Sequence, residues 1–177
     1  MEFTSKDREL VQTFKECLSL NNEIGKKARS TEKERRYFRL QFGNVVFYRQ
    51  LLDIGLTPAK SKTLGALKIP AVYLADFLRG HLDGDGCIRS YSDPVYKNSI
   101  RLYTTFSSAS LKHIYWLQGK IRGLANIEGF IRHGTRVFSL TYAKKDSISL
   151  CSYLYHSKNI PCLERKYRIV EPFLINT

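Results

Sequence analysis

Apolar residues recur at helical spacing in the centre of the chain, between Tyr73 and Asp83. The residues on the apolar face of this predicted helix are Leu74, Phe77, Leu78, His81 and Leu82. The helix ends in the run Asp83-Gly84-Asp85-Gly86, whose glycines permit a left-handed exit. A carboxylate at this end meets the negative pole of the helix dipole, so the position of Asp85 is favourable only if a cation lies nearby.

The flanking segments alternate between strand and helix patterns. Period-two alternation predicts a strand at 37–42, with Tyr37, Arg39 and Gln41 on one face, and a strand at 100–106. Hairpins are predicted at 87–106 and around His133-Gly134-Thr135. Helices are predicted to begin at Ser5, at Asn44, at Ser107 or Ser108, at Asp146 and after Ile160-Pro161-Cys162.

The second half of the chain repeats the plan of the first. Leu10 aligns with Leu111, Phe38 with Phe138 and Pro58 with Pro161, at offsets of 101, 100 and 103 residues. Offsets this long indicate a duplicated domain, with a partial repeat at 1–70 and a complete repeat at 71–177. A counterpart of Asp85 would precede Met1, so the first repeat is expected to lack its first helix and one strand.

The composition describes a basic globular chain. It has 177 residues, 43% of them hydrophobic, which is enough to bury a core. Its 29 Lys and Arg residues exceed 16 Asp and Glu, and the net charge of +13 favours a polyanionic partner, nucleic acid above all. No apolar run is long enough to span a membrane, and no signal peptide follows Met1. We therefore expect no membrane partner and an intracellular location, in cytoplasm, nucleoid or organelle matrix.

Cysteine and histidine show no metal-site spacing. Buried reduced thiols are the expectation for Cys17, Cys87, Cys151 and Cys162. The histidines do not cluster along the sequence, and ordinary core or surface positions are expected for His81, His113, His133 and His156.

The acidic run at the end of the central helix has two interpretations. Four residues of the type Asp-Gly-Asp-Gly often form a solvated turn. An EF-hand loop is excluded, because its fifth and twelfth positions would be Cys87 and Pro94. The wider stretch 78–86, LRGHLDGDG, resembles the nine-residue signature of the LAGLIDADG homing endonucleases. It matches at Leu78, Gly80, Asp83, Asp85 and Gly86, whereas Arg79 and His81 depart from the usual small and apolar choices.

The resemblance covers Phe3 to Phe173 and implies an α+β fold: a duplicated α-β-β-α-β-β-α unit with saddle-shaped antiparallel sheets. In that family two motif helices meet at a twofold or pseudo-twofold axis, and here Gly80, Gly84 and Asp83 would form the interface. Each helix delivers one acid to divalent metal ions, Mg²⁺ or another. That ligand would be Asp85, with the carbonyl of Gly84 as a further donor. Because this chain offers one such acid, either a homodimer through the 73–84 helix or a degenerate relative is expected.

The function implied is site-specific cleavage of double-stranded DNA, with Lys60 and Lys166 near the scissile phosphate as further catalytic residues. The alternatives are a non-catalytic DNA-binding regulator and a maturase that binds intron RNA.

Outward strand positions nominate the DNA contacts. The groove-facing candidates are Arg89, Tyr91, Arg101, Tyr103, Arg132, Arg136, Tyr37, Arg39 and Gln41. The candidates for phosphate contacts are Lys26, Lys27, Arg29, Arg35 and Arg36.

Overall fold

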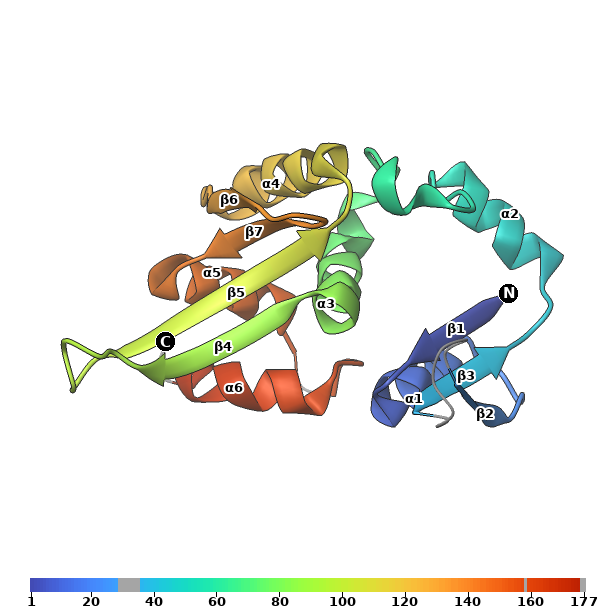
Figure 1. Ribbon diagram of the computed structural model, residues 1–177, viewed down its shortest axis with the longest axis horizontal. Helices are drawn as coiled ribbons and strands as arrows, with labels where there is room; N and C mark the ends of the chain where they lie inside the picture. Colours follow the sequence, from blue (N-terminus) through green and yellow to red (C-terminus); the bar gives the residue numbers. More distant parts are fainter. Residues whose placement is uncertain (29–35, 158, 176–177) are drawn as a thin grey trace.

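The computed structural model of the protein describes residues 1–28, 36–157 and 159–175. Within these ranges the chain forms two open antiparallel sheets and six α-helices. The N-terminal sheet has the strand order β1-β3-β2, and the C-terminal sheet has the order β4-β5-β7-β6 (Figure 1). The predicted α+β class with antiparallel sheets is confirmed.

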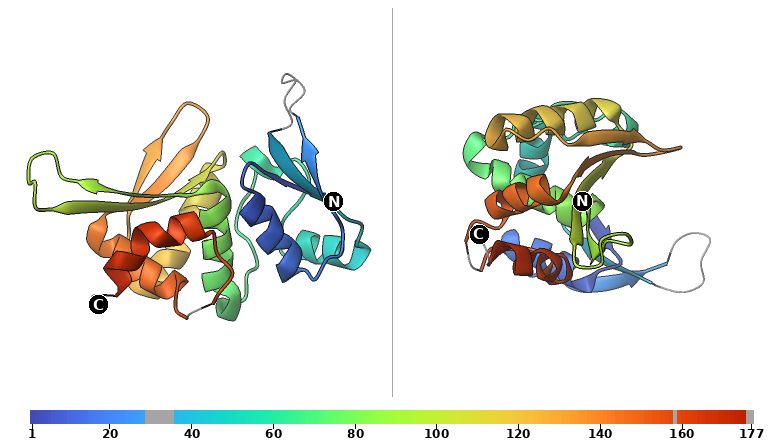
Figure 2. Two further views of the ribbon diagram at one scale, coloured as in Figure 1. Left: turned by 90° about the horizontal axis from the view of Figure 1, so that it is seen from below. Right: turned by 90° about the vertical axis from the view of Figure 1, so that its left-hand side faces the viewer.

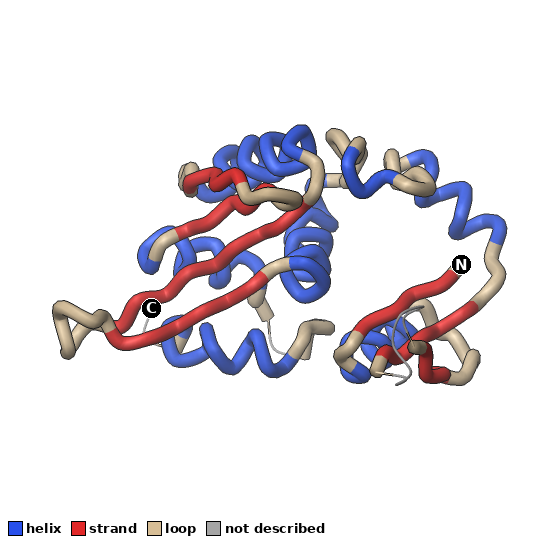
Figure 3. Tube along the Cα trace, viewed as in Figure 1, coloured by secondary structure: helices blue, strands red, loops and turns tan. Residues whose placement is uncertain are grey.

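The two longest strands, of six and nine residues, belong to the second sheet. The strands are β1 (Glu2–Ser5), β2 (Ile24–Lys27), β3 (Tyr37–Gln41), β4 (Cys87–Ser92), β5 (Ile100–Ser108), β6 (Phe130–His133) and β7 (Phe138–Tyr142). The α-helices are α1 (Arg8–Cys17), α2 (Val45–Asp53), α3 (Leu74–Asp85), α4 (Leu111–Ala125), α5 (Lys144–Leu154) and α6 (Glu164–Leu174). Two short 3-10 turns, η1 (Lys60–Lys62) and η2 (Ala71–Tyr73), connect α2 to α3. Figure 3 shows how the helices and strands alternate along the chain.

The two sheets share one plan. The order β1-β3-β2 in the first matches β5-β7-β6 in the second. Phe3 lies opposite Leu40 in the first sheet, and Phe106 lies opposite Leu140 in the second. The C-terminal sheet carries one further strand, β4, on the outer edge of β5, and the helix α3 precedes it.

The main core lies under the C-terminal sheet. Leu74, Leu78 and Leu82, one helical turn apart on α3, share a buried cluster with Phe106 of β5 and with residues of α4 and α5. Figure 2 (left) shows the strands of both sheets toward one side of the molecule and most of the helices toward the other. One side of each sheet is therefore left uncovered.

The exit from α3 is extended rather than left-handed. Gly86 caps the helix with φ −95° and ψ 178°, which any residue can adopt. Glycine is required there for another reason, because a Cβ on Gly86 would lie 2.6 Å from the carbonyl oxygen of Leu82. The predicted left-handed turn is wrong, and a close backbone approach takes its place.

Three predicted helix starts are shifted by a few residues. The helix α1 begins after Asp7, and the Ser5 hydroxyl accepts the backbone N–H of Asp7. Ser110, not Ser107 or Ser108, precedes α4. Asp146 lies inside the first turn of α5 rather than at its cap. Matching the caps Asp7 and Ser110 gives an offset of 103 residues, so the alignment of Leu10 with Leu111 is wrong by two positions.

The α2 helix begins and ends where predicted. The Asn44 side chain accepts the N–H of Phe47, and Gly55 follows the helix with φ +102°.

The thiols are only partly as expected. Cys151 is buried, but Cys17 and Cys87 are exposed, because the ends of α1 and β4 are open to solvent at these positions. In the part of the chain that is described, no helix combines the length and apolar character needed to cross a membrane.

Candidate functional site

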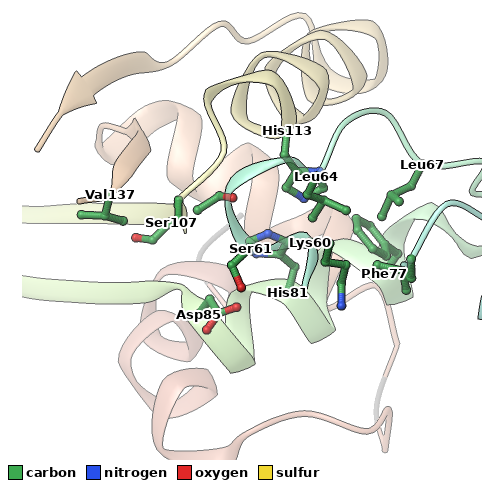
Figure 4. A pocket seen from close by; sticks show the side chains of 13 residues that line it. Lys60, Ser61, Leu64, Leu67, Phe77, His81, Asp85, Ser107, His113 and Val137 are labelled. Carbon is green, nitrogen blue, oxygen red and sulfur yellow. The ribbon is translucent and has the colours of Figure 1, made fainter. Parts of the chain in front are cut away.

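Asp85 is the last residue of α3 and is exposed to solvent. Among the described residues, no hydrogen bond or ion pair engages its carboxylate. It lines a pocket of about 490 Å³ together with Lys60 and Ser61 of η1, His81 of α3 and Ser107 of β5. In Figure 4 the Ser61 hydroxyl is directed toward the Asp85 carboxylate. The predicted metal ligand therefore stands free at an open site.

Lys166 does not face this pocket. The residue is 4% exposed, and its ammonium donates to the carbonyl oxygens of Leu82 at 2.6 Å, Asp83 at 2.8 Å and Gly86 at 2.7 Å. These carbonyls belong to the C-terminal end of α3, where a cation opposes the helix dipole. In this structure Lys166 caps the C-terminal end of α3. Its three N–H donors are all used by the carbonyl oxygens, so none is free for the expected contact with a phosphate.

Asp83 in turn caps the N-terminal end of α6. The residue is 4% exposed, and its carboxylate accepts the N–H of Leu163 at 2.9 Å, just ahead of the first turn of α6. Burial raises the pKa of Asp83, and the hydrogen bond from Leu163 and the nearby Lys166 oppose that rise. Burial disfavours the charged form of Lys166 as well, which lowers the pKa of this ammonium, while the nearby Asp83 opposes the shift. The end of α3 and the start of α6 thus cap one another.

Arg79 explains one departure from the family signature. The residue is 3% exposed, and its guanidinium donates to the carbonyl oxygens of Leu154 and Pro161, both at 2.8 Å, and to the Asp76 carboxylate. The arginine therefore ties α3 to the segment that enters α6. Its polar atoms are satisfied although it occupies a core position.

His81 and His113, separate in sequence, meet in the structure. Their rings stack with centroids 5.3 Å apart beside Phe77, and both line the pocket that holds Asp85. The His113 Nδ1 lies 3.0 Å from the Gly65 carbonyl oxygen. The pKa of His81 is lowered to about 4, chiefly by burial and also by the nearby His113, while Asp85 opposes the shift. The two histidines are 32 positions apart in the sequence and meet because α4 lies against α3 in the fold.

One face of α3 is open. Tyr73 is 60% exposed, and nothing lies within 4 Å of a Cβ built on Gly80 or Gly84. We call Tyr73, Asp76, Gly80 and Gly84 the exposed face of α3; Figure 1 and Figure 2 (left) show that α3 itself lies on the side of the C-terminal half that is nearest to the N-terminal sheet. Asp83, predicted to share this face, lies instead on the buried side with the α6 N-terminus. A second helix has access to the two glycines.

The outer face of the C-terminal sheet carries the predicted DNA contacts. Arg89 lies opposite Tyr103, and Tyr91 opposite Arg101, so these four side chains share one face. The rings of Tyr91 and Tyr103 are stacked at 6.1 Å. Arg101 is tied to the Asp93 carboxylate at 2.5 Å, which holds the pKa of Asp93 near about 2.

The second hairpin extends this face. Arg132 is paired with Ser139 in β7, which in turn is paired with Ser107 in β5. Its guanidinium lies 5.0 Å from the ring centre of Phe130. Arg136 is exposed in the turn between β6 and β7. Both arginines are therefore available to a ligand laid on the sheet.

The N-terminal sheet presents a smaller set. Tyr37, Arg39 and Gln41 lie on one face, joined by Lys27 and by Glu2, whose carboxylate contacts the Lys27 ammonium at 2.5 Å. Glu2 partly neutralises this face, and the strand pattern alone does not predict its position there. Lys26 pairs with Phe38 and lies on the opposite face, so it does not share the surface formed by Tyr37, Arg39 and Gln41. Arg36 is exposed just before β3, whereas Arg29 and Arg35 lie outside the described residues.

The donor atoms around Asp85 fit a hard divalent cation. The carboxylate is free, and the Gly84 carbonyl is not among the three that Lys166 occupies. Oxygen donors of this kind suit Mg²⁺ and Ca²⁺ rather than softer metals. Within the described ranges, no three His, Cys, Asp or Glu side chains form a metal-binding group, so the chain's own contribution is small.

Comparison of the coordinates with solved structures gives consistent neighbours. The LAGLIDADG homing endonuclease I-LtrWI bound to target DNA superposes with a TM-score of 0.58 over 98% of this chain and 78% of that chain, at 13% identity. The LAGLIDADG meganuclease I-AabMI bound to uncleaved DNA gives 0.56 over 98% and 79%, at 13% identity. I-SmaMI bound to an uncleaved DNA target in the presence of calcium ions gives 0.53 over 90% and 74%, at 13% identity.

These neighbours share the fold that the sequence predicts. The chain therefore has the LAGLIDADG homing endonuclease fold. No protein-family model matches the sequence, and no curated protein is similar enough to give a match.

Proposed function

We propose that this protein binds double-stranded DNA along its two sheets and hydrolyses it with a divalent cation held at Asp85. The observation that carries the proposal is a free carboxylate at the end of α3, beside an outer sheet face lined with arginine and tyrosine. The neighbours bound to DNA, one of them with calcium present, support it at the level of the shared fold. We also take 1–70 and 71–177 as the two repeats.

The residues of this chain would act mainly by position. Asp85, with the Gly84 carbonyl, would hold Mg²⁺ or another divalent cation, which stabilises the attacking water and the leaving oxygen in phosphodiester hydrolysis. Ser61 and Lys60 line the same pocket, where a hydroxyl and an ammonium would contact a phosphate oxygen. Lys166 and Asp83 would hold the end of α3 in place rather than touch the substrate.

Cleavage of both strands needs a second acid beside the first. The exposed face of α3, with Gly80 and Gly84 uncovered, would receive the helix that brings it. A homodimer through α3 is one arrangement that would place two Asp85 carboxylates at one axis.

Binding without cleavage is the second candidate, as in a DNA-binding regulator or an intron RNA maturase. It is favoured by the small donor set, since the described residues contain one acid at this site.

The test is Asp85→Asn, assayed with Mg²⁺ on a randomised duplex DNA library whose cut ends are sequenced. Loss of cleavage with duplex affinity unchanged supports the metal assignment. Asp53→Asn is the matched control, because Asp53 is an exposed acid at the C-terminal end of α2. Cleavage that persists in Asp85→Asn would overturn the assignment. Duplex binding by the unaltered chain with no cleavage, or tighter binding to structured intron RNA, would favour the second candidate.

A further inference from the structure

An apolar groove lies on the N-terminal sheet; Asp85 does not line it, although Leu56 and Lys60 border both this groove and the pocket of Asp85. We call this apolar groove the aromatic groove; its volume is about 590 Å³. Its principal lining residues are Phe3, Phe14, Phe42, Phe47, Tyr48 and Leu51. The four phenylalanine rings form a continuous row, with neighbouring centroids 4.2, 6.0 and 6.2 Å apart. An open apolar row of this size on a small sheet marks a binding surface.

The second half of the chain shows what covers the equivalent surface. Phe3 on β1 has the place of Phe106 on β5, because each lies opposite the corresponding leucine of the neighbouring strand. Phe106 is fully buried in one cluster with Leu78 and Leu82 of α3, whereas Phe3 is only partly buried. The missing cover is therefore a helix like α3.

The helices beneath the two sheets show the same difference. Counted from the caps Asn44 and Ala143, the equivalent positions are Tyr48 and Ser147, Leu51 and Leu150, and Leu52 and Cys151. The three α5 positions are buried, but Tyr48 is 40% and Leu52 is 36% exposed. No residue of α2 is buried. The apolar side chains are in place on α2, and the partner that would bury them is not among the described residues.

The edge of β1 is also open. Met1 and Phe42 exchange backbone hydrogen bonds, so the peptide groups of Glu2 and Thr4 point away from β3. In the second sheet, β4 pairs along the corresponding edge of β5. Within the described residues β1 has no such neighbour. An unpaired edge beside an apolar groove is a template for a helix followed by a strand.

We propose that the aromatic groove and the edge of β1 bind a helix–strand segment of the same kind as 74–92, supplied by polypeptide outside residues 1–177. The segment needs large apolar residues at every fourth position toward the groove. It needs small residues on its other side, because the exposed face of α3 offers two glycines there. The proposal goes beyond the nuclease assignment and does not depend on it, since it rests on packing alone.

A second whole copy fits this space less well. The N-terminal sheet already stands across from α3 (Figure 1), so a second whole copy that approached α3 from this side would meet it. The sheet is held there by α1, because Arg165 donates to the Asp7 carboxylate at 2.7 Å and the Glu164 N–H donates to Glu9 at 2.7 Å. A single helix and strand can enter without breaking these contacts.

The probe is a dye-labelled synthetic peptide copying residues 71–92, titrated onto the full chain. We expect saturable one-to-one binding by anisotropy and a shift of the Thr4 amide signal in ¹⁵N NMR spectra. Tyr48→Glu is expected to weaken binding about tenfold or more, because it places a charge in the aromatic groove. Val46→Glu is the matched control: it lies on the same helix, is 68% exposed and does not line the groove.

A second experiment tests the same contact even if the free peptide binds only weakly. The same segment is fused ahead of Met1 through a flexible linker, which raises its effective concentration. The fusion is expected to resist urea better than a fusion in which the segment's three leucines are serine. If neither arm shows binding, or if Tyr48→Glu and Val46→Glu act equally, the proposal is wrong. A dimer of about 41 kDa, twice the 20.5 kDa chain, that is lost in Tyr73→Glu but kept in Tyr48→Glu would replace it with the homodimer.

Discussion

Replacing Lys166 by methionine separates a structural role from a catalytic one. The ammonium makes three hydrogen bonds, at 2.6, 2.8 and 2.7 Å, to carbonyl oxygens at the end of α3. Methionine keeps most of the apolar stem but removes the charge and all three donors. The carbonyls of Leu82 and Asp83 would then be left without this partner in a buried setting.

The expected loss of stability follows from these contacts. A hydrogen bond to a charged group contributes about 1.5–3 kcal/mol net, and part of the sum is returned because the buried ammonium no longer has to be desolvated. We therefore expect Lys166→Met to lower the free energy of unfolding by about 2–4 kcal/mol. For a domain of this size such a loss moves the urea midpoint clearly.

Urea unfolding followed by circular dichroism measures the effect. Lys62→Met is the control, because Lys62 is exposed in η1 and undergoes the same chemical change; it is expected to alter stability by less than about 0.5 kcal/mol. If Lys166→Met unfolds at the same urea concentration as the unaltered chain but loses DNA cleavage, the capping argument is refuted. Lys166 would then act on the substrate.

Three further predictions concern titration and close packing. The pKa of His81 is lowered from 6.5 to about 4, chiefly by burial, so the unfolded chain takes up a proton at this residue before the folded chain does. The free energy of unfolding should therefore be unaffected by His81 above pH 6.5 and should fall by about 3 kcal/mol as the pH drops from 6.5 through 4. In His81→Phe, unfolding measured as a function of pH should lack this decrease. The pKa of Asp93 is about 2 beside Arg101 and should rise toward 3.8 in Arg101→Leu, which carboxyl NMR can follow. The stability that Asp93 contributes while ionised should then disappear at a higher pH in the variant than in the unaltered chain. Gly86→Ala should cost about 2–4 kcal/mol, since its Cβ meets Leu82 backbone at 2.6 Å, whereas Gly84→Ala should cost nothing by thermal melting.

The parts of the fold that the sequence predicts are those set by local periodicity. The alternation at 37–41 and 100–106 gives the strands and their faces, and Asn44 and Gly55 give the ends of α2. Serine and aspartate near a helix start mislead by two or three residues, because Ser5 and Ser108 form local turns with the N–H groups of Asp7 and Ser110 instead. Local patterns identify the element but leave its first residue undetermined.

The site is predicted only where one residue suffices. Asp85 is nominated because its acid stands at a helix end within a short signature, and the structure places it at that helix end beside a pocket. The role of Lys166 depends on residues some 80 positions away, so spacing along the chain carries no sign of it. The stacking of His81 on His113 likewise needs α4 to lie against α3. The neutralising Glu2 is found only from the register of β1 with β3, which no single strand pattern specifies.

The mutual capping of α3 and α6 connects the fold to the chemistry. Asp83 and Lys166 each bind backbone atoms of the opposite helix. A shift of α6 must therefore also move Asp85, which lies two positions after Asp83 in the sequence. The same first turn of α6 holds α1 through Arg165 and Asp7, so it also positions the N-terminal sheet. One junction therefore fixes both the carboxylate and the surface opposite it. A helix that entered between α3 and the N-terminal sheet would pack its apolar side on the aromatic groove and its small residues on the exposed face of α3. The junction fixes the distance between these two surfaces, and the proposed approach of a second acid to Asp85 depends on that distance.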